Sequence, residues 1–444
     1  MNLKKSLFMT TAVLALPSII QQLMTNLAQM VDNLMVGQLR VEAIAGVTIT
    51  NQVFFIFTLV LFGIGSTAGI YLTQYHGIGN KKKMREVFRM SLIFSFLTGL
   101  IFFLLMGFFS EQILGFFASD PKTIADAMSY LDFLRYTFLI FPLSMAISNG
   151  FRYSGFVRLP MYLSILTVIL GIVLNYGFIH GNMGFPALGV AGAGLATLLT
   201  RIFEASLHVA LTIILKSPIK ISLLKAFGFS KEMFQGFVKK GYGLVLNEFF
   251  WAFGIQALTV IYTQRVSANI ASLSISQALG NMIFIGMGGM SAAYSILLGE
   301  QLGKSQFEEA KILAKKLLKI SAGIGLGLGA VIFMMSYFVF NLYEVSPDII
   351  ATARQLLFIN AAFSWLYYMN GGFYFILRSG GDTRGVVLVD SGFNWVIVMP
   401  IAFVLGLFGL PLMVHFLLVQ LLELLKFYVG SRLFQKKVWL RNLT

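Results

Sequence analysis

Arg152-Tyr-Ser-Gly155-Phe-Val-Arg158 and Arg378-Ser-Gly-Gly381-Asp-Thr-Arg384 are two copies of one pattern, a glycine turn flanked by arginines. They lie 226 positions apart in a chain of 444 residues, and the same offset aligns residues 45–51 with residues 271–277. Agreement on one offset in two separate regions indicates a repeat of about half the chain. In a strongly apolar chain, such a repeat predicts two homologous membrane-spanning bundles, which commonly place a substrate site at their interface.

The composition indicates a protein of the lipid bilayer. Hydrophobic residues make up 57% of the chain and charged residues 11%, whereas a soluble domain carries about 25% charge. Cysteine is absent, which excludes disulfide frameworks, thiolate zinc sites and cysteine nucleophiles. We expect no metal centre and no cofactor, because the histidines are scattered without the spacing of metal ligands: His76, His180, His208 and His415.

The apolar segments predict an all-α integral membrane protein with twelve transmembrane helices in two pseudo-symmetric six-helix bundles. A spanning helix needs about 20 mainly apolar residues. The first apolar run continues to about residue 37 without a small-residue cleavage site, which favours a first span over a signal peptide. The predicted spans are centred in residues 10–36, 44–74, 88–109, 128–149, 161–180, 187–213, 240–262, 268–298, 318–342, 349–376, 386–407 and 410–430.

The predicted domains are an N-terminal bundle over residues 1–215, a basic cytoplasmic connector over 216–239 and a C-terminal bundle over 240–444. Most of the 33 Lys and Arg residues fall on the side of the two termini, so the positive-inside rule places both termini in the cytoplasm. We expect a multi-pass, monomeric protein of the cell membrane whose positive charge attracts lipid head groups rather than nucleic acid. Connector lysines include Lys216, Lys220, Lys225, Lys231 and Lys239, and the opposite side holds Arg40, Lys122, Arg135, Arg265 and Arg354.

Asp32 is an ionisable residue near the end of the first predicted span. Ionisable groups within spans are costly and usually face a cavity or a partner. Gln22, Asn26 and Gln29 precede it at helical spacing and extend one polar stripe along the helix. The alternative is a packing face with hydrogen bonds between helices. We interpret the stripe as functional, with Gln29 and Asn33 lining a substrate cavity.

Glu248 lies in the seventh span beside Asn247, one turn before Trp251. Burial favours the protonated form of a carboxyl group, which suits a proton- or cation-coupling site. The alternative is an interfacial glutamate that caps the helix. Asn247 is assigned to the substrate cavity.

Other polar residues within spans have two interpretations each. Asp390, with Asn394 one turn on, lines the cavity or holds the loop of Arg378 and Arg384. Asp382 is expected to stabilise that loop through the neighbouring arginines, and direct participation in transport is the alternative. Interhelical hydrogen bonding and substrate contact are equally plausible for Asn51, Gln277 and Asn281, and structural ion pairs are expected for Glu204 with Arg201 and for Glu423 with Lys426.

These residues together resemble the multidrug and toxic compound extrusion family over essentially the whole chain. The resemblance rests on Val31-Asp32-Asn-Leu-Met-Val-Gly37-Gln-Leu39, Gly189-Val-Ala-Gly-Ala-Gly-Leu-Ala-Thr197, Asn247-Glu248, Leu377-Arg378-Ser-Gly-Gly-Asp382-Thr383 and Trp439-Leu-Arg-Asn-Leu-Thr444. It implies secondary antiport, in which small organic cations or amphipathic drugs leave while Na⁺ or H⁺ enters. Surfaces rich in methionine and aromatic residues, of which the chain has 21 Met and 44 Phe, suit such varied ligands.

The resemblance also implies the coupling residues. Asp32 matches the aspartate of a cation site in the N-terminal bundle of relatives. Asn175 and Thr197 match two further positions of that site. Relatives with the full site carry aspartate at the position of Asn175 and asparagine at that of Gly171, so the site is depleted here. Glu248 matches the coupling glutamate of members that use the C-terminal bundle, and it is our first candidate.

Two other function classes were weighed. A flippase for a lipid-linked glycan has a related fold, but its cavity would carry arginines to hold phosphates. The intramembrane set here is mainly acidic, with Arg201 the main exception. An enzyme is not expected, because there is no clustered His/Asp set, metal motif or phosphate-binding loop.

Overall fold

The computed structural model describes residues 3–39, 41–118, 120–215, 217, 219, 228–264, 270–343 and 345–444, and these ranges contain helices and loops without a strand. The basic residues Arg40, Lys216, Lys220, Lys225 and Arg265 lie outside the described residues. The chain divides into two compact units. The N-terminal unit is Ile20–Gly241, and the C-terminal unit is Tyr242–Thr444 together with Met1–Ile19.

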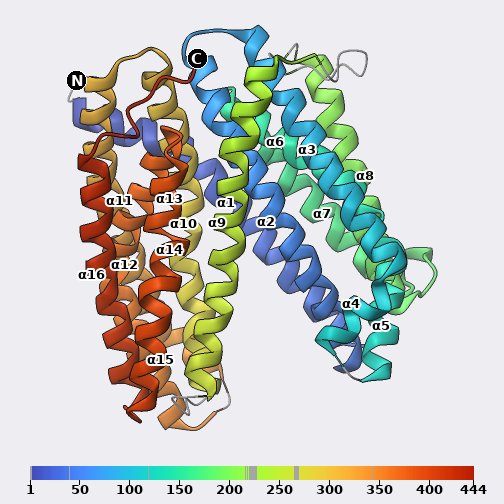
Figure 1. Ribbon diagram of the computed structural model, residues 1–444. Coiled ribbons are helices and arrows are strands. Elements are labelled where there is room, and N and C mark those ends of the chain that lie inside the picture. Colours follow the sequence, from blue (N-terminus) through green and yellow to red (C-terminus); the bar gives the residue numbers. More distant parts are fainter. Residues whose placement is uncertain are drawn as a thin grey trace. The chain divides into compact units, whose positions relative to one another are not determined.

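The N-terminal unit is built around α2, which packs against α3, α5 and α6, while α8 packs against α5, α6 and α7 (Figure 1). Its core includes the buried rings of Phe57 and Phe138, whose centroids are 5.0 Å apart in an edge-to-face arrangement. The helices are α1 (Leu3–Gly37, shared with the other unit), α2 (Val41–Gly77), α3 (Lys81–Phe108), α4 (Ser110–Phe117), α5 (Pro121–Leu134), α6 (Thr137–Tyr153), α7 (Arg158–His180), η1 (Asn182–Gly184) and α8 (Gly189–Ile214).

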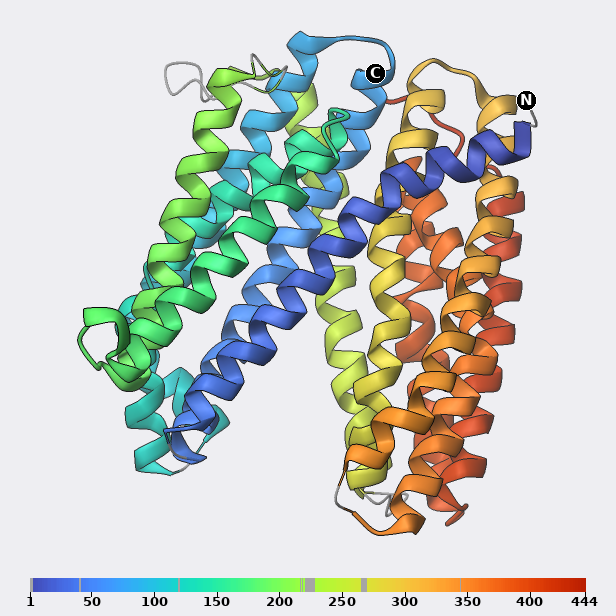
Figure 2. The ribbon, with the colours of Figure 1, turned by 180° about the vertical axis from the view of Figure 1, so that it is seen from behind.

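The C-terminal unit is built around α12, which packs against α10, α11 and α16. The first part of α1 belongs to this unit and approaches α10, where Gly289 faces Ala15 and Ile19 (Figure 2). The helices are α9 (Lys231–Gln264), α10 (Ile270–Gly303), α11 (Phe307–Val339), η3 (Phe340–Leu342), α12 (Pro347–Ser379), α13 (Thr383–Val389), α14 (Ser391–Phe393), η4 (Asn394–Val398), α15 (Met399–Leu407) and α16 (Leu412–Gln435).

The described residues contain 11 candidate spans, and the bent pair α5–α6 supplies one more, for a total of 12. The span predicted over 128–149 corresponds to this pair of helices, α5 and α6, which meet at an angle of 55°. At the bend the amide of Phe138 bonds to the carbonyl of Arg135, three residues back, and the hydroxyl of Thr137 donates to the carbonyl of Leu134. Such local bonds interrupt the regular ladder and kink a helix.

Two further boundaries differ from the predictions. Helix α9 begins at Lys231, so the last part of the predicted connector is helical. The predicted helix over 386–407 is broken at Asp390, whose φ of −115° and ψ of −95° separate α13 from α14, and a π-helical turn follows at Asn394–Val398. Irregular turns of this kind within helices are frequent at functional sites.

The predicted repeat is visible in the backbone of the two arginine-flanked turns. Helix α6 ends at Tyr153 and α12 ends at Ser379, 226 positions later. Gly155 and Gly381 both have positive φ, +90° and +69°, a conformation that glycine adopts without steric cost. The amide of Gly155 bonds to the carbonyl of Arg152 at 3.3 Å, and the equivalent bond joins Gly381 to Arg378 at 2.8 Å.

A second pair of turns repeats at the same offset. The amide of Gly79 bonds to the carbonyl of His76 after α2, and the amide of Ser305 bonds to the carbonyl of Leu302 after α10, each at 3.0 Å. Both turn residues have positive φ, +69° at Gly79 and +58° at Ser305. These two pairs of turns therefore have matching conformations at equivalent positions of the two units.

Candidate functional site

Asp32 and Asn175 are brought together in the N-terminal unit, from α1 and α7. Asn175 Nδ2 donates to Asp32 Oδ1 at 2.5 Å. Asn175 is buried, and its Oδ1 has no hydrogen-bond partner among the described residues. Tyr130 of α5 is buried and interacts electrostatically with Asp32 and with the side chain of Thr197. The hydroxyl of Thr197 donates to the carbonyl of Ala193 at 2.9 Å.

Arg201 of α8 places a positive charge beside this group. Its Nη1 lies 2.6 Å from Glu204 Oε2, which confirms the predicted ion pair. The guanidinium also lies 4.6 Å from the centroid of the Phe141 ring, and it interacts electrostatically with Asp32. One turn on, His208 Nδ1 is 2.9 Å from the carbonyl oxygen of Glu204. Arg201, Glu204 and His208 thus form a row of linked polar groups along α8.

Several amides of the α1 polar stripe and of the predicted substrate cavity are exposed on the surface of their units rather than buried. Gln22 Nε2 donates to Asn26 Oδ1 at 3.2 Å, so part of the α1 stripe is internally bonded. Exposed amides in the middle of a span are poorly suited to lipid and favour contact with water or a ligand. The exposed amides are Gln22, Asn26, Gln29, Asn33 and Asn51 in the N-terminal unit and Gln277 and Asn281 in the C-terminal unit, while Asn394 is half-buried.

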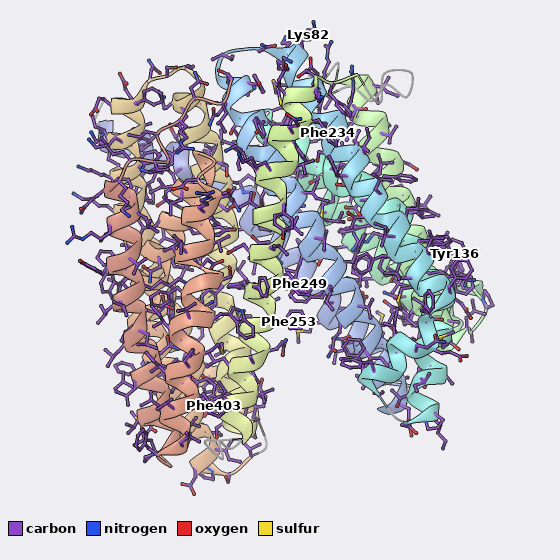
Figure 3. All side chains as sticks on the ribbon, viewed as in Figure 1. Lys82, Tyr136, Phe234, Phe249, Phe253 and Phe403 are labelled. Carbon is purple, nitrogen blue, oxygen red and sulfur yellow. The ribbon has the colours of Figure 1, made fainter. Side chains whose placement is uncertain are left out.

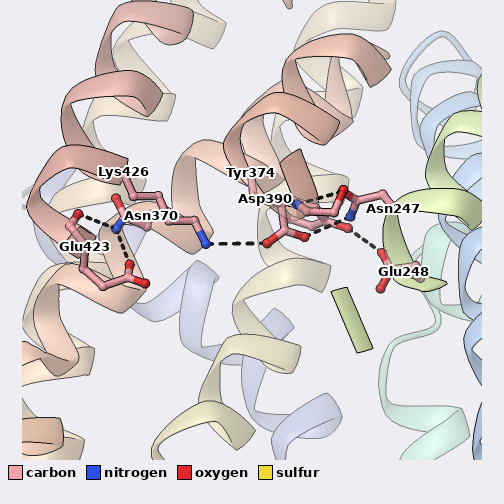
Figure 4. A network of polar contacts seen from close by, with 8 residues as sticks. Asn247, Glu248, Asn370, Tyr374, Asp390, Glu423 and Lys426 are labelled. Carbon is pink, nitrogen blue, oxygen red and sulfur yellow. Dashed lines mark hydrogen bonds and ion pairs between the residues drawn. The ribbon is translucent and has the colours of Figure 1, made fainter. Parts of the chain in front are cut away.

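Asn247 anchors α9 to the break in the eleventh span (Figure 4). Its Nδ2 donates to Asp390 Oδ2 at 2.9 Å, and its Oδ1 accepts from the amide and the hydroxyl of Ser391 at 3.3 and 2.8 Å. Asn247 is completely buried. Its side chain therefore supplies hydrogen-bond partners to Asp390 and Ser391 at the point where the helix is interrupted.

Glu248 is buried at 7% exposure, and its Oε1 accepts a hydrogen bond of 2.7 Å from the hydroxyl of Tyr374. The capping interpretation is wrong, because α9 begins at Lys231, far upstream. Asp390 and Arg378 both act on Glu248 electrostatically. The guanidinium of Arg378 lies 5.3 Å from the Tyr374 ring centroid, and its Nη2 donates to Ser291 Oγ at 2.5 Å.

Lys426 of α16 joins the same network from the other side. Its Nζ lies 3.6 Å from Asp390 Oδ1. The predicted pairing of Lys426 with Glu423 is thus replaced by an ion pair with Asp390, although Glu423 still acts on Lys426 electrostatically. Glu423 Oε2 accepts from Asn370 Nδ2 at 2.7 Å. Asp390 is bound by Asn247 and Lys426, whereas the alternative assigned it to the arginine-flanked loop.

In each arginine-flanked turn, the first arginine is hydrogen-bonded to a side chain of another helix, and the second arginine is exposed. Arg152 donates to Gln21 Oε1 at 2.7 Å, in the position where Arg378 binds Ser291. Arg158 and Arg384 are exposed. Within the second turn, Asp382 Oδ1 accepts from the amide of Gly385 at 3.1 Å and caps α13. Asp382 thus bonds to the backbone at the start of α13, and its predicted role in the loop stays a prediction.

Three residues of these networks were not predicted from the sequence: Tyr374 and Asn370 of α12 and Tyr130 of α5. A signal was present in α12, because Tyr367, Asn370, Tyr374 and Arg378 recur at spacings of three and four, as one face of a helix does. Among the described residues, no group of three or more His, Cys, Asp or Glu side chains is arranged to hold a metal ion.

Comparison with known proteins gives consistent matches along the chain. The MatE family model matches residues 17–177 and again 245–404. The chain is 25% identical over 412 residues to "Probable multidrug resistance protein NorM" of Thermotoga maritima, covering 89% of this chain and 86% of that protein. It is 26% identical over 397 residues to "Uncharacterized transporter YisQ" of Bacillus subtilis, covering 85% and 84%.

Solved structures show the same fold. A crystal structure of MATE in complex with MaL6 matches with a TM-score of 0.88 at 18% identity, covering 97% of this chain and 96% of that one. The outward-facing conformation of a MATE family multidrug resistance transporter matches with a TM-score of 0.84 at 19% identity, with the same coverage. Since the family model matches well over half of the chain, this protein belongs to the MatE family, the multidrug and toxic compound extrusion transporters.

Proposed function

We propose that this transporter exports cationic amphipathic compounds across the cell membrane in exchange for H⁺ or Na⁺, with both termini in the cytoplasm. The observation that carries the proposal is the buried Glu248–Tyr374 pair within the polar network of the C-terminal unit. A carboxyl group at this depth is costly to maintain and is typical of ion and proton pathways.

The hydroxyl of Tyr374 suits a carboxyl group that changes its charge. A tyrosine hydroxyl both donates and accepts hydrogen bonds, whereas an ionised carboxylate only accepts. Tyr374 therefore donates to ionised Glu248, as in the structure, and can accept a bond from the protonated form after rotation of its hydroxyl. The pair remains satisfied in both states, which lowers the barrier to exchange of a proton for a cation.

An aromatic surface adjoins this carboxyl group. Phe249 and Phe253 lie one turn apart on α9, with ring centroids 4.6 Å apart, and both are exposed (Figure 3). Aromatic faces attract organic cations by about 0.5–1 kcal/mol at exposed sites and more when water is excluded. Relatives named as probable multidrug resistance proteins support the same cargo class.

Arg201 and Lys426, two partly buried bases of the spans, do not favour an anionic cargo, because each is already paired with a carboxylate. Arg201 binds Glu204, and Lys426 binds Asp390. In the N-terminal unit, Asp32 and the unpartnered Oδ1 of Asn175 offer oxygen ligands for a second cation.

The test uses purified protein in proteoliposomes loaded with ethidium, under an imposed gradient of H⁺ or Na⁺. In wild-type protein, one of these two cation gradients is expected to drive ethidium movement in the opposite direction. Glu248→Gln is expected to lose the ethidium movement that the pH gradient drives. Glu308→Gln is the matched control, because Glu308 forms an exposed ion pair with Lys311 in the same unit. Absence of gradient-driven ethidium movement in wild-type protein would reject the proposal.

A further inference from the structure

Lys426 occupies an unusual position for a lysine in a membrane span, between two carboxylates. Its side chain is 13% exposed, its Nζ lies 3.6 Å from Asp390 Oδ1, and Glu423 acts on it electrostatically from one turn earlier on α16. Lysine side chains in spans are costly unless they are paired. Lys426 is therefore a fixed positive charge within the acidic cluster of the C-terminal unit.

Neutral amides orient the two carboxylates that flank Lys426. Asn247 binds the other oxygen of Asp390 at 2.9 Å, and Asn370 binds Glu423 Oε2 at 2.7 Å (Figure 4). These amides hold the carboxylates in place but contribute no net charge. Within this part of the cluster the charge balance depends on Lys426.

The charges of the whole cluster are nearly balanced. Glu248, Asp390 and Glu423 are acidic, and Lys426 and Arg378 are basic, which leaves one negative charge when all five are ionised. In the part of the chain that the structure describes, the other polar side chains with contacts to the cluster include the neutral Asn247, Asn370, Tyr374, Tyr367, Ser291 and Ser391. A buried cluster tolerates net charge poorly, so it favours the uptake of one monovalent cation.

We infer that Lys426 sets the number of cations that the C-terminal unit exchanges in each transport cycle. As a tethered counter-charge it satisfies one of the three carboxylates, so that the cluster takes up one H⁺ or Na⁺ instead of two. This inference rests on the proposed cation-coupled transport and assigns a stoichiometry to it. It makes Lys426 a positioning residue that acts through Asp390 and Glu423.

The experiment measures stoichiometry as the steady-state ethidium gradient that a known cation gradient sustains in proteoliposomes, with the membrane potential clamped at zero. Each additional cation per ethidium raises the sustained gradient by about tenfold for a tenfold cation gradient. Lys426→Met is expected to increase the stoichiometry by one. Lys426→Arg, which keeps the charge, and the double variant Asp390→Asn/Lys426→Met, which restores the balance, are expected to match wild-type protein.

Lys311→Met is the control for loss of a lysine, since Lys311 forms an exposed ion pair with Glu308 at 3.0 Å on α11. Asp390→Asn alone removes a negative charge and is expected to lower the stoichiometry by one, so the inference remains testable where Lys426→Met does not fold. Unchanged stoichiometry in the folded variants, in a preparation whose wild-type protein is coupled, would overturn the inference. Wild-type protein that responds to neither gradient would instead overturn the proposed function.

Discussion

Asn175 donates its side-chain amide to Asp32 across 2.5 Å, while its own Oδ1 is buried without a hydrogen-bond partner among the described residues. A buried acceptor that is left unsatisfied costs about 1–3 kcal/mol. The N-terminal unit therefore combines one carboxylate with one free carbonyl oxygen, two ligands that suit a monovalent cation. This arrangement supports the first two predictions.

Asp32→Asn is expected to abolish export while the protein still folds, because the amide has the shape of the carboxylate without its charge. The measurement is resistance to ethidium in cells that express wild-type and variant protein at equal level, together with the melting temperature of each purified protein. Asp132→Asn is the control, since Asp132 is an exposed aspartate of α5 in the same unit. Full resistance with Asp32→Asn would contradict a role for this site.

Asn175→Asp is expected to strengthen Na⁺ dependence by giving Asp32 a second carboxylate as neighbour. Two adjacent carboxylates repel each other unless a cation or proton lies between them. We expect the Na⁺ concentration that half-saturates ethidium efflux to fall by about tenfold, which corresponds to about 1.4 kcal/mol. An unchanged Na⁺ response would show that no cation binds beside Asp32.

The sequence predicts the spans well because a long apolar run in a bilayer has few alternatives to a helix. It does not predict the break at Asp390, because that break is accompanied by hydrogen bonds that form only in the folded unit, such as that from Asn247 to Asp390. The bend at Arg135, with its local bonds to the carbonyls of Arg135 and Leu134, was not predicted either. The second repeated turn was also missed. Gly79 and Ser305 share a conformation but not a residue type.

The candidate site follows the same division. Asp32 and Glu248 are conspicuous in sequence because a carboxylate in an apolar run has a high energetic cost. Their partners are not conspicuous: Tyr374 lies 126 positions from Glu248, and tyrosine is common in spans. The sequence predicts that Lys426 pairs with Glu423 on the same helix. In the folded unit, Asp390 lies close enough to Lys426 to form the ion pair instead.

Tyr374→Phe is expected to weaken pH-driven efflux without abolishing it, while Glu248→Gln abolishes it. The phenylalanine leaves Glu248 without the 2.7 Å hydrogen bond, and a bond to a charged group contributes about 1.5–3 kcal/mol. An efflux rate about tenfold or more below wild-type is expected in proteoliposomes. Tyr428→Phe is the control, because Tyr428 is exposed and, among the described residues, its hydroxyl accepts a hydrogen bond from the side chain of Arg432. Equal rates for both tyrosine variants would argue against the role of Tyr374.

Gly155→Ala and Gly107→Ala are expected to change stability in opposite directions. Gly155 has a φ of +90°, which disfavours any side chain, and the substitution should cost about 1–2 kcal/mol. Gly107 lies within α3, and a methyl group there would meet no atom within 4 Å. Alanine at this helical position should be stabilising by about 0.5–1 kcal/mol. Melting temperatures of the purified variants decide the sign, and a stabilising Gly155→Ala would contradict the turn geometry.

The C-terminal segment is expected to act as a structural clasp on the C-terminal unit. Trp439 is fully buried, stacks on Phe434 at 5.5 Å and donates its indole N–H to the Phe434 carbonyl. Further along, Asn442 donates to the carbonyl of Gly303 and to the hydroxyl of Ser305, in the turn after α10. The segment thus joins the end of α16 to a turn more than 130 positions earlier, at separations of 139 and 137 residues.

Trp439→Ala is expected to cost about 3–5 kcal/mol, as for other large buried aromatic residues, and to release the segment. Gly380→Ala is expected to release it by a different route, because a methyl group at residue 380 would collide with the carbonyl of Trp439. Cleavage of the C-terminal residues by carboxypeptidase should therefore accelerate in both variants, and their melting temperatures should fall. Trp365→Ala provides the control, since Trp365 is 38% exposed on α12 and makes a smaller buried contribution. Protection of the segment in both variants, equal to that in wild-type protein, would show that these contacts do not hold it.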